Sequence, residues 1–383
     1  MSYYLDNAAT TNVSKEVLSE MNKYFEYEYG NPSSIHTMGQ HAKKNIEEAR
    51  ECIANFIGCE SSEIIFTASG SEANNLAIKG FCFSNECEII TTGIEHKSVL
   101  ESCNFLRKHA IIKNVLKVNV CELGLVDTEH LEALCKEVFN RKSVPFVSIQ
   151  FANSEIGTIQ PIKIISDIVH KYNGILHVDA VQAFGNTRIR VKHFNIDMMS
   201  VSGHKIHAPK GIGFLYKKKD IKIEPLVNGG HQELGLRAGT ENVPYIVGLA
   251  KAVTMIKYSN WKYICQMRDY FIDKLNDEFP NIRINGSQIV RLPGNINVSF
   301  KNIDGESLLI LLNLHYIYVS NGSACNAGSL ESSYVLKEIG VPDDYINGTI
   351  RITINEEINK EAIDYIISKI KKCLEIMESA KGE

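Results

Sequence analysis

Two predicted strands end in residues that could bind an anion or move a proton. In "TASGSEANN" (67–75) an apolar strand gives way to a helix, and Gly70 and Ser71 could present backbone N–H groups and a hydroxyl to a phosphate. Taken alone, the same stretch also fits an ordinary serine N-cap, with Asn74 and Asn75 on the surface. In "GIEHKSV" (93–99) a histidine, His96, follows the next strand. A lone histidine at such a place can be structural or catalytic.

Two further strand ends carry charge. "LHVDAVQA" (176–183) ends an apolar strand at Asp179, and a carboxylate there needs a cationic partner, since burying it unpaired is costly. "MMSVSGHKIHAPKGIG" (198–213) leads a strand into Lys205. Desolvation near other cations makes such a lysine a nucleophile for carbonyl groups, although it could also be a solvated turn lysine.

Taken together, these residues match the parts of a pyridoxal-phosphate site. Lys205 would form the Schiff base, Asp179 would keep the pyridine nitrogen protonated, and His96 would lie against the ring. The remaining contacts would come from Gln182 on the phenolic oxygen and from Ser202 and His204 on the phosphate. The signatures of a Walker loop, a zinc protease and a dinucleotide fold are missing from the sequence, which predicts no metal site.

A cysteine stands in an unusual context near the end of the chain. "VSNGSACNAGSL" (319–330) is built from small and polar residues that favour turns, with Cys325 in its middle. Free cysteines are usually buried, so this one is either a surface thiol in a permissive loop or a reactive group.

The elements that must position these residues alternate between strand and helix, which predicts an α/β fold with a mostly parallel sheet covered by helices. Ligands bind such sheets at the carboxyl ends of the strands. From about residue 260 the pattern changes to that of a smaller α+β unit. We expect a large domain over 15–258 and a small domain formed by 1–14 and 259–383, which carries the Cys325 loop.

The bulk composition limits the possible functions. The net charge is −4, with 41 basic and 45 acidic residues, so nothing favours nucleic-acid binding. The first residues lack a signal-peptide pattern, and no apolar run is long enough to span a bilayer, which predicts a cytoplasmic protein. The ten cysteines form no CxxC pair, which argues for reduced thiols.

A series of motifs along nearly the whole chain resembles the NifS/IscS-type cysteine desulfurases, which are fold-type I, class V pyridoxal-phosphate enzymes. The motifs are "YLDNAATT", "YGNPSSIH", "NLAIKG", "HVDAVQ", "SGHKIHAPKGIG", "GGHQELGLRAGTENVP" and "GSACNAGSLESSYVL". The resemblance implies conversion of L-cysteine to L-alanine, with the sulfur left as a persulfide on Cys325. That sulfur would pass to an acceptor protein such as an iron–sulfur scaffold, or serve tRNA thiolation.

The resemblance also implies roles for particular residues. Lys205, Asp179 and His96 keep the roles given above, and Ser71, Ser202 and His204 contact the phosphate. The family is homodimeric with its site at the subunit interface, which implies that Thr240 contacts the phosphate from the partner subunit. Arg351 would grip the substrate carboxylate, with Asn31 beside it.

The sequence departs from the family pattern at two positions. Ser154 replaces an asparagine that helps Gln182 hold the phenolic oxygen, and its shorter reach puts that contact in doubt. Asn355 replaces a glycine, where we expect only a surface turn to change. The alternatives are a selenocysteine lyase, a class V aminotransferase, and a non-catalytic sulfur-relay scaffold. An aminotransferase would not depend on Cys325.

Overall fold

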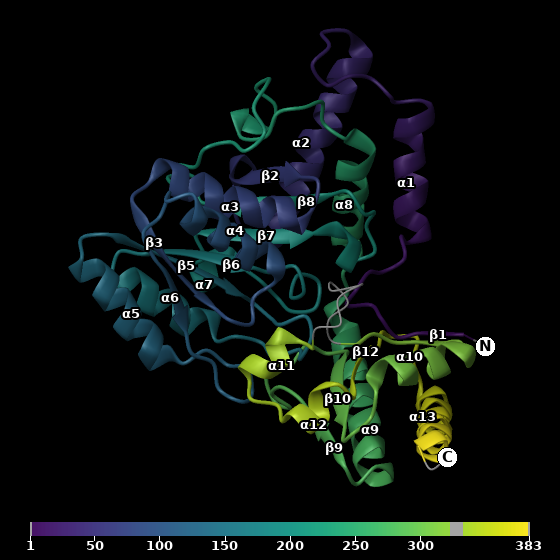
Figure 1. Cartoon of the computed structure of the whole chain (residues 1–383). Helices are drawn as coiled ribbons and strands as arrows, with labels where there is room; N and C mark the ends of the chain where they lie inside the picture. Colours follow the sequence, from purple (N-terminus) through teal and green to yellow (C-terminus); the bar gives the residue numbers. More distant parts are fainter. Residues whose placement is uncertain (1, 322–331, 382–383) are drawn as a thin grey trace.

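The computed structural model describes residues 2–321 and 332–381, and its main feature is a seven-stranded sheet (Figure 1). The strand order is β2-β8-β7-β6-β5-β3-β4, and β8 alone in this sheet runs antiparallel to its neighbours. The strands are β2 (Ile64–Thr67), β3 (Cys87–Thr92), β4 (Val115–Val118), β5 (Val144–Gln150), β6 (Ile175–Asp179), β7 (Met198–Ser202) and β8 (Gly213–Lys217). The predicted mostly parallel sheet is confirmed.

Helices cover both faces of this sheet because successive strand residues are apolar and point to opposite sides. In β3, Ile89 packs in a core with α3 and α4, whereas Ile90 packs in a second core with α2, α5, α6 and α8. The helices are α1 (Lys15–Glu26), α2 (Thr37–Ile57), α3 (Gly70–Ser84), α4 (Lys97–Lys108), α5 (Thr128–Asn140), α6 (Ile162–Lys171), α7 (Val191–Phe194) and α8 (Val243–Met255).

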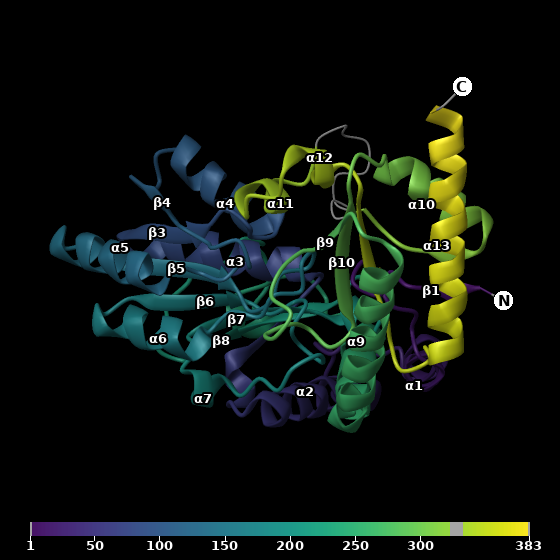
Figure 2. The ribbon, with the colours of Figure 1, turned by 90° about the horizontal axis from the view of Figure 1, so that it is seen from below.

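The C-terminal part of the chain builds a three-stranded antiparallel sheet of order β12-β10-β9, with its own core. Its elements are α9 (Trp261–Glu278), β9 (Ile282–Ile284), β10 (Asn295–Phe300), α10 (Gly305–Leu314), β11 (Ile317–Tyr318), α11 (Tyr334–Glu338), α12 (Asp343–Ile346), β12 (Thr349–Thr353) and α13 (Lys360–Lys381). In Figure 2, α13 lies at the edge of the molecule farthest from the large sheet. In the part of the chain that the structure describes, no helix combines the length and hydropathy needed to cross a bilayer.

The N-terminal segment joins the two parts. β1 (Tyr3–Tyr4) pairs in parallel with β11, and Asp6 forms a bridge with Thr353 at the end of β12. The segment then reaches the large sheet, where the backbone N–H of Thr11 donates to the carbonyl of His204 at 2.9 Å. Residues 6–11 therefore pass along the edge of the large sheet where the predicted site lies.

Candidate active site

One cavity gathers most of the predicted site residues. Since β2, β3, β5, β6 and β7 run parallel, their carboxyl ends meet at one edge of the sheet. The cavity there has a volume of about 300 Å³, and the predicted residues that line it are Gly70, Ser71, His96, Ser154, Asp179, Gln182, Ser202, His204, Lys205 and Arg351.

The start of α3 forms one wall of the cavity. Ser69 caps the helix, since its hydroxyl accepts from the N–H of Glu72 at 3.1 Å. A Cβ added at Gly70 would lie 2.6 Å from Cγ2 of Val181 and 3.2 Å from Cβ of Ser202, so only glycine allows this close approach to the end of β7. The first N–H groups of α3 can thus meet an anion beside the buried Ser202.

His204 is a neutral neighbour of this anion site. Burial, together with the charges of Lys205 and Lys210, lowers its pKa to about 4. Its Nδ1 lies 3.2 Å from the hydroxyl of Thr10. A neutral imidazole can still donate one hydrogen bond to a phosphate oxygen.

Asp179 is buried and accepts hydrogen bonds from two N–H groups. Its Oδ1 accepts from the backbone N–H of Val181 at 3.0 Å, and its Oδ2 accepts from Nδ2 of Asn74 at 2.7 Å. None of the salt bridges within residues 2–321 and 332–381 includes Asp179. The cationic partner expected from the sequence is thus not a side chain of the described residues, which fits a carboxylate that pairs with a protonated ring nitrogen.

Lys205 lies at the end of a short 3-10 turn, Gly203–Lys205, directly after β7. Its Nζ donates to the carbonyls of Ala8 at 2.6 Å and Ala9 at 2.7 Å. Nε2 of Gln182 donates to the same Ala8 carbonyl at 3.0 Å. The N-terminal segment therefore borders the amine and the amide on one side.

Arg351 reaches the cavity from β12 and is 3% exposed. Its Nη2 donates to Oδ1 of Asp6 at 2.8 Å, and its Nη1 donates to the carbonyl of Ser154 at 3.2 Å. Its Nε is buried and has no hydrogen-bond partner among the described residues. Buried donors are rarely left unpaired, so this N–H is available to a carboxylate that enters the cavity.

Two of the predicted residues, Asn31 and Thr240, do not line the cavity of a single chain. Asn31 is exposed in the turn before α2, where its Oδ1 accepts from the N–H of Ser33 at 2.9 Å, so within one chain it does not lie beside Arg351. Thr240 is exposed as well. Cys325 lies outside the described residues.

Asn355, the second position that departs from the family pattern, lies in the turn after β12. Its Oδ1 accepts from the N–H of Glu357.

Residues of the site that the sequence did not single out include Asn74, Asp6 and Ser98. Asn74 is 1% exposed, which excludes the surface position considered for it. The signal was present in the helical period, because residues 70, 73, 74 and 77 of α3 share one buried face. The contact of Asp6 with Arg351 spans 345 positions, so no local pattern could have shown it.

The site fits pyridoxal phosphate on three observations of the structure. The glycine cradle at Gly70 suits a phosphate, Asp179 is buried without a cation among the described residues, and Lys205 lies in the same cavity. These are the anion, ring-nitrogen and amine partners that the cofactor requires.

Comparison with known proteins identifies the family of the chain. The model of the aminotransferase class-V family matches residues 3–366. A cysteine desulfurase IscS from Dictyoglomus turgidum is 43% identical over 378 residues, which cover 97% of this chain and 94% of the relative. A solved NifS-like protein has a TM-score of 0.90 at 38% identity, covering 98% of this chain and all of that chain. A structure of SspA in complex with cysteine has a TM-score of 0.80 at 36% identity, covering 92% of this chain and 99% of that one. The chain therefore belongs to the class-V aminotransferase family, among its pyridoxal-phosphate-dependent cysteine desulfurases.

Proposed function

We propose that this desulfurase takes sulfur from L-cysteine, leaves it as a persulfide on Cys325, and releases L-alanine. The observation that carries the substrate assignment is the buried Nε of Arg351, which has no hydrogen-bond partner among the described residues and lies in the cavity that also holds Lys205. An α-carboxylate can accept from this N–H while the substrate amine lies toward the lysine. The solved complex of SspA with cysteine supports the same substrate.

Each cavity residue has a holding role in this proposal. Gly70, Ser71, Ser202 and His204 hold the phosphate, Asp179 holds the ring nitrogen, and Gln182 and Ser154 hold the phenolic oxygen. The bound cofactor supplies an electron sink for bonds that break at the substrate. His96 would lie against the ring and assist the proton transfers, and Lys205 would bind the cofactor.

The sulfur transfer balances without a further reactant. The Cys325 thiolate attacks the substrate sulfur, a sulfur–sulfur bond forms, and the carbon–sulfur bond breaks. The electron pair of the broken carbon–sulfur bond stays on carbon, and this carbon then takes a proton. L-cysteine and the Cys325 thiol thus give L-alanine and a Cys325 persulfide. Only a thiolate attacks in this way, so Cys325 needs a base or a lowered pKa.

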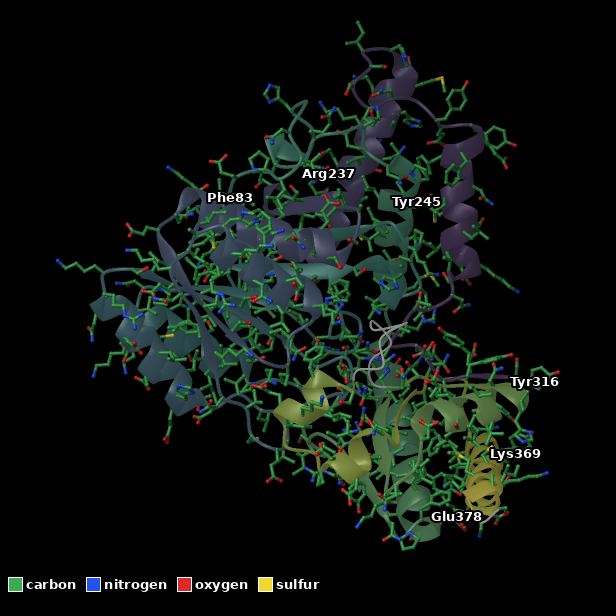
Figure 3. All side chains as sticks on the ribbon, viewed as in Figure 1. Phe83, Arg237, Tyr245, Tyr316, Lys369 and Glu378 are labelled. Carbon is green, nitrogen blue, oxygen red and sulfur yellow. The ribbon has the colours of Figure 1, made fainter. Side chains whose placement is uncertain are left out.

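A second copy of the chain is part of the proposal, with Thr240 and Asn31 contributed across the interface. Large apolar side chains are exposed near both residues: Tyr27 is 74%, Tyr29 70%, Ile35 95% and Leu234 63% exposed. The α1–α2 turn and the 231–234 loop line a common hollow on the surface. Arg237, labelled in Figure 3, anchors the loop by donating to Glu72 on α3 at 3.0 Å. An apolar surface of this kind favours burial against a partner.

The persulfide sulfur would pass to an acceptor protein, for iron–sulfur cluster assembly or tRNA thiolation. We place this reaction in a reducing compartment such as the cytoplasm, because the acceptor thiol must stay reduced. The nine cysteines of the described residues are all free, which supports this placement.

The deciding experiment measures alanine and sulfide from L-cysteine for the purified protein and two variants. Cys325→Ser should keep the cofactor absorbance and release almost no sulfide, whereas Lys205→Ala should lose the absorbance of the lysine-bound cofactor. Undiminished sulfide from Cys325→Ser would reject the persulfide step on Cys325. An unchanged Lys205→Ala spectrum would move the cofactor linkage to another lysine.

A further inference from the structure

A chain of hydrogen bonds runs from Asp179 to His96 through two side chains with no assigned role. Nδ2 of Asn74 lies 2.7 Å from Oδ2 of Asp179 and 2.9 Å from Oγ of Ser98. Oγ of Ser98 lies 2.7 Å from Nδ1 of His96. The chain connects β6, α3 and α4, so it ties together three strand ends of the site.

The direction of these hydrogen bonds follows from their donors. A carboxylate only accepts, so the amide group of Asn74 must turn its NH₂ toward Asp179. The second amide hydrogen then goes to Oγ of Ser98, which leaves the Ser98 hydroxyl free to donate to Nδ1 of His96. The backbone N–H of Ser98 donates to the same Nδ1 at 3.1 Å. Nδ1 is therefore an acceptor, and the proton of the neutral ring lies on Nε2.

Asn74 occupies its position at a cost in stability. Its Oδ1 is buried and has no hydrogen-bond partner among the described residues. A buried acceptor without a hydrogen bond lowers the stability of the folded protein. A small apolar residue would avoid that cost at this place on the buried face of α3, so the amide is better explained by its two donated hydrogen bonds.

We propose that Asn74 and Ser98 are positioning residues that fix the His96 ring, with Nδ1 as acceptor and the proton on Nε2. They connect this ring to Asp179 through hydrogen bonds. This rests on the proposed role of His96 in proton transfer, and it specifies the atom involved. The Nε2–H group is then the part of the ring that can donate to the substrate, because a nitrogen that already carries a proton cannot accept another. The same network holds the Asp179 carboxylate in the orientation in which it meets the ring nitrogen.

The first test determines the His96 tautomer without using activity. Holoenzyme labelled with ¹⁵N-histidine is studied by NMR, and His96→Gln assigns the signal. The network requires the Nε2–H tautomer in the unmodified protein, so an Nδ1–H tautomer would overturn it. In Asn74→Ala and Ser98→Ala we expect a measurable fraction of the other tautomer. A His96 signal identical to that of the unmodified protein in both variants would also overturn the proposal.

The second test separates positioning from general stability. Ser98→Ala should lower kcat for alanine formation about tenfold, equivalent to about 1.4 kcal/mol, with less than a twofold change in KM. Ser98→Thr should restore kcat because it keeps the hydroxyl. Asn104→Ala, an exposed asparagine on α4, serves as the matched control. If Ser98→Ala and the control form alanine with equal kcat, the positioning role is rejected, although the proposed function is kept. A protein that forms no alanine but shows the Nε2–H tautomer would reject the proposed function and keep the network.

Discussion

Arg351 is a buried guanidinium whose contacts leave room for one more acceptor. Asp6 and the Ser154 carbonyl satisfy Nη2 and Nη1, and Nε has no partner among the described residues. A lysine has a single charged point and cannot present two donors in a plane. The geometry therefore favours arginine for a carboxylate.

Arg351→Lys should raise KM for L-cysteine about 10- to 100-fold, which corresponds to about 1.4–2.7 kcal/mol of lost binding. Steady-state alanine formation measures the effect. Arg283→Lys, on β9 with its side chain 31% exposed, is the control and should keep KM. A KM that is unchanged in Arg351→Lys would remove Arg351 from substrate binding.

Gly70 has no side chain, and this allows the start of α3 to lie close to the ends of β6 and β7. In Gly70→Ala the new methyl group would lie 2.6 Å from Val181, so the start of α3 must move away from β7. We expect the Kd for pyridoxal phosphate to rise at least about tenfold, because the helix N–H groups lose their position. Absorbance titration of the apoprotein measures this. Ser84→Ala, at the other end of α3, should titrate like the unmodified protein, and equal affinities in all three would contradict the phosphate site.

At the scale of elements, α11 joins the C-terminal part to loops of the large sheet. Oγ of Ser333, its N-cap, donates to Oε2 of the buried Glu155 at 2.5 Å, and the hydroxyl of Tyr334 donates to the carbonyl of Glu95 at 2.7 Å. These contacts fix the chain directly after the segment that includes Cys325. Their partners are neighbours of Ser154 and His96 in the sequence, so Ser333 and Tyr334 contact the large sheet beside two site residues.

The buried carboxyls at these contacts predict a dependence of stability on pH. Burial raises the pKa of Glu155 to about 7 and, with a contribution from Asp179, that of Glu95 to about 8. The folded protein then keeps protons that the unfolded chain releases above about pH 4.5, so stability is lost as the pH rises toward 7 and 8. Arg351 and the Ser333 hydroxyl oppose the shift at Glu155 without cancelling it.

Glu155→Gln should remove part of this pH dependence. Between pH 6 and pH 8 we expect the free energy of unfolding to fall by about 1 kcal/mol less in the variant than in the unmodified holoenzyme. Urea unfolding at the two pH values measures it. Glu122→Gln changes a side chain that is 82% exposed and should keep the original slope. Parallel slopes in all three proteins would show that Glu155 is ionised when folded.

At the scale of the whole molecule, the exposed position of Thr240 leads us to expect that two variant subunits can complement each other in a dimer. Lys205→Ala and Thr240→Ala subunits should each be inactive or weak alone. In a mixed dimer, a Thr240→Ala subunit keeps Lys205 and receives Thr240 from its partner, so one complete site forms. Alanine formation after co-expression of the two variants should therefore exceed that of either parent. Activity no higher than that of the parents, in a dimer verified by light scattering, would place Thr240 in its own chain's site or outside the site.

The sequence by itself determined the local elements and the residues at the strand ends. The predicted change of pattern near residue 260 coincides with the start of α9 at Trp261, and the residues predicted at the carboxyl ends of the parallel strands lie around one cavity. This was possible because the apolar period of each element, and the residue that ends it, are properties of neighbouring positions. Motifs such as "SGHK" likewise lie within one turn of the chain.

The tertiary structure alone decided which distant residues complete the site. Asn74 and Asp179 are 105 positions apart, and Asp6 and Arg351 are 345 apart. Their contacts depend on the sheet order and on the pairing of the N-terminal segment with β11, which no local pattern specifies. For this reason the sequence could name Asp179 as a buried carboxylate, but only the fold showed that an amide of α3 holds it and connects it to His96.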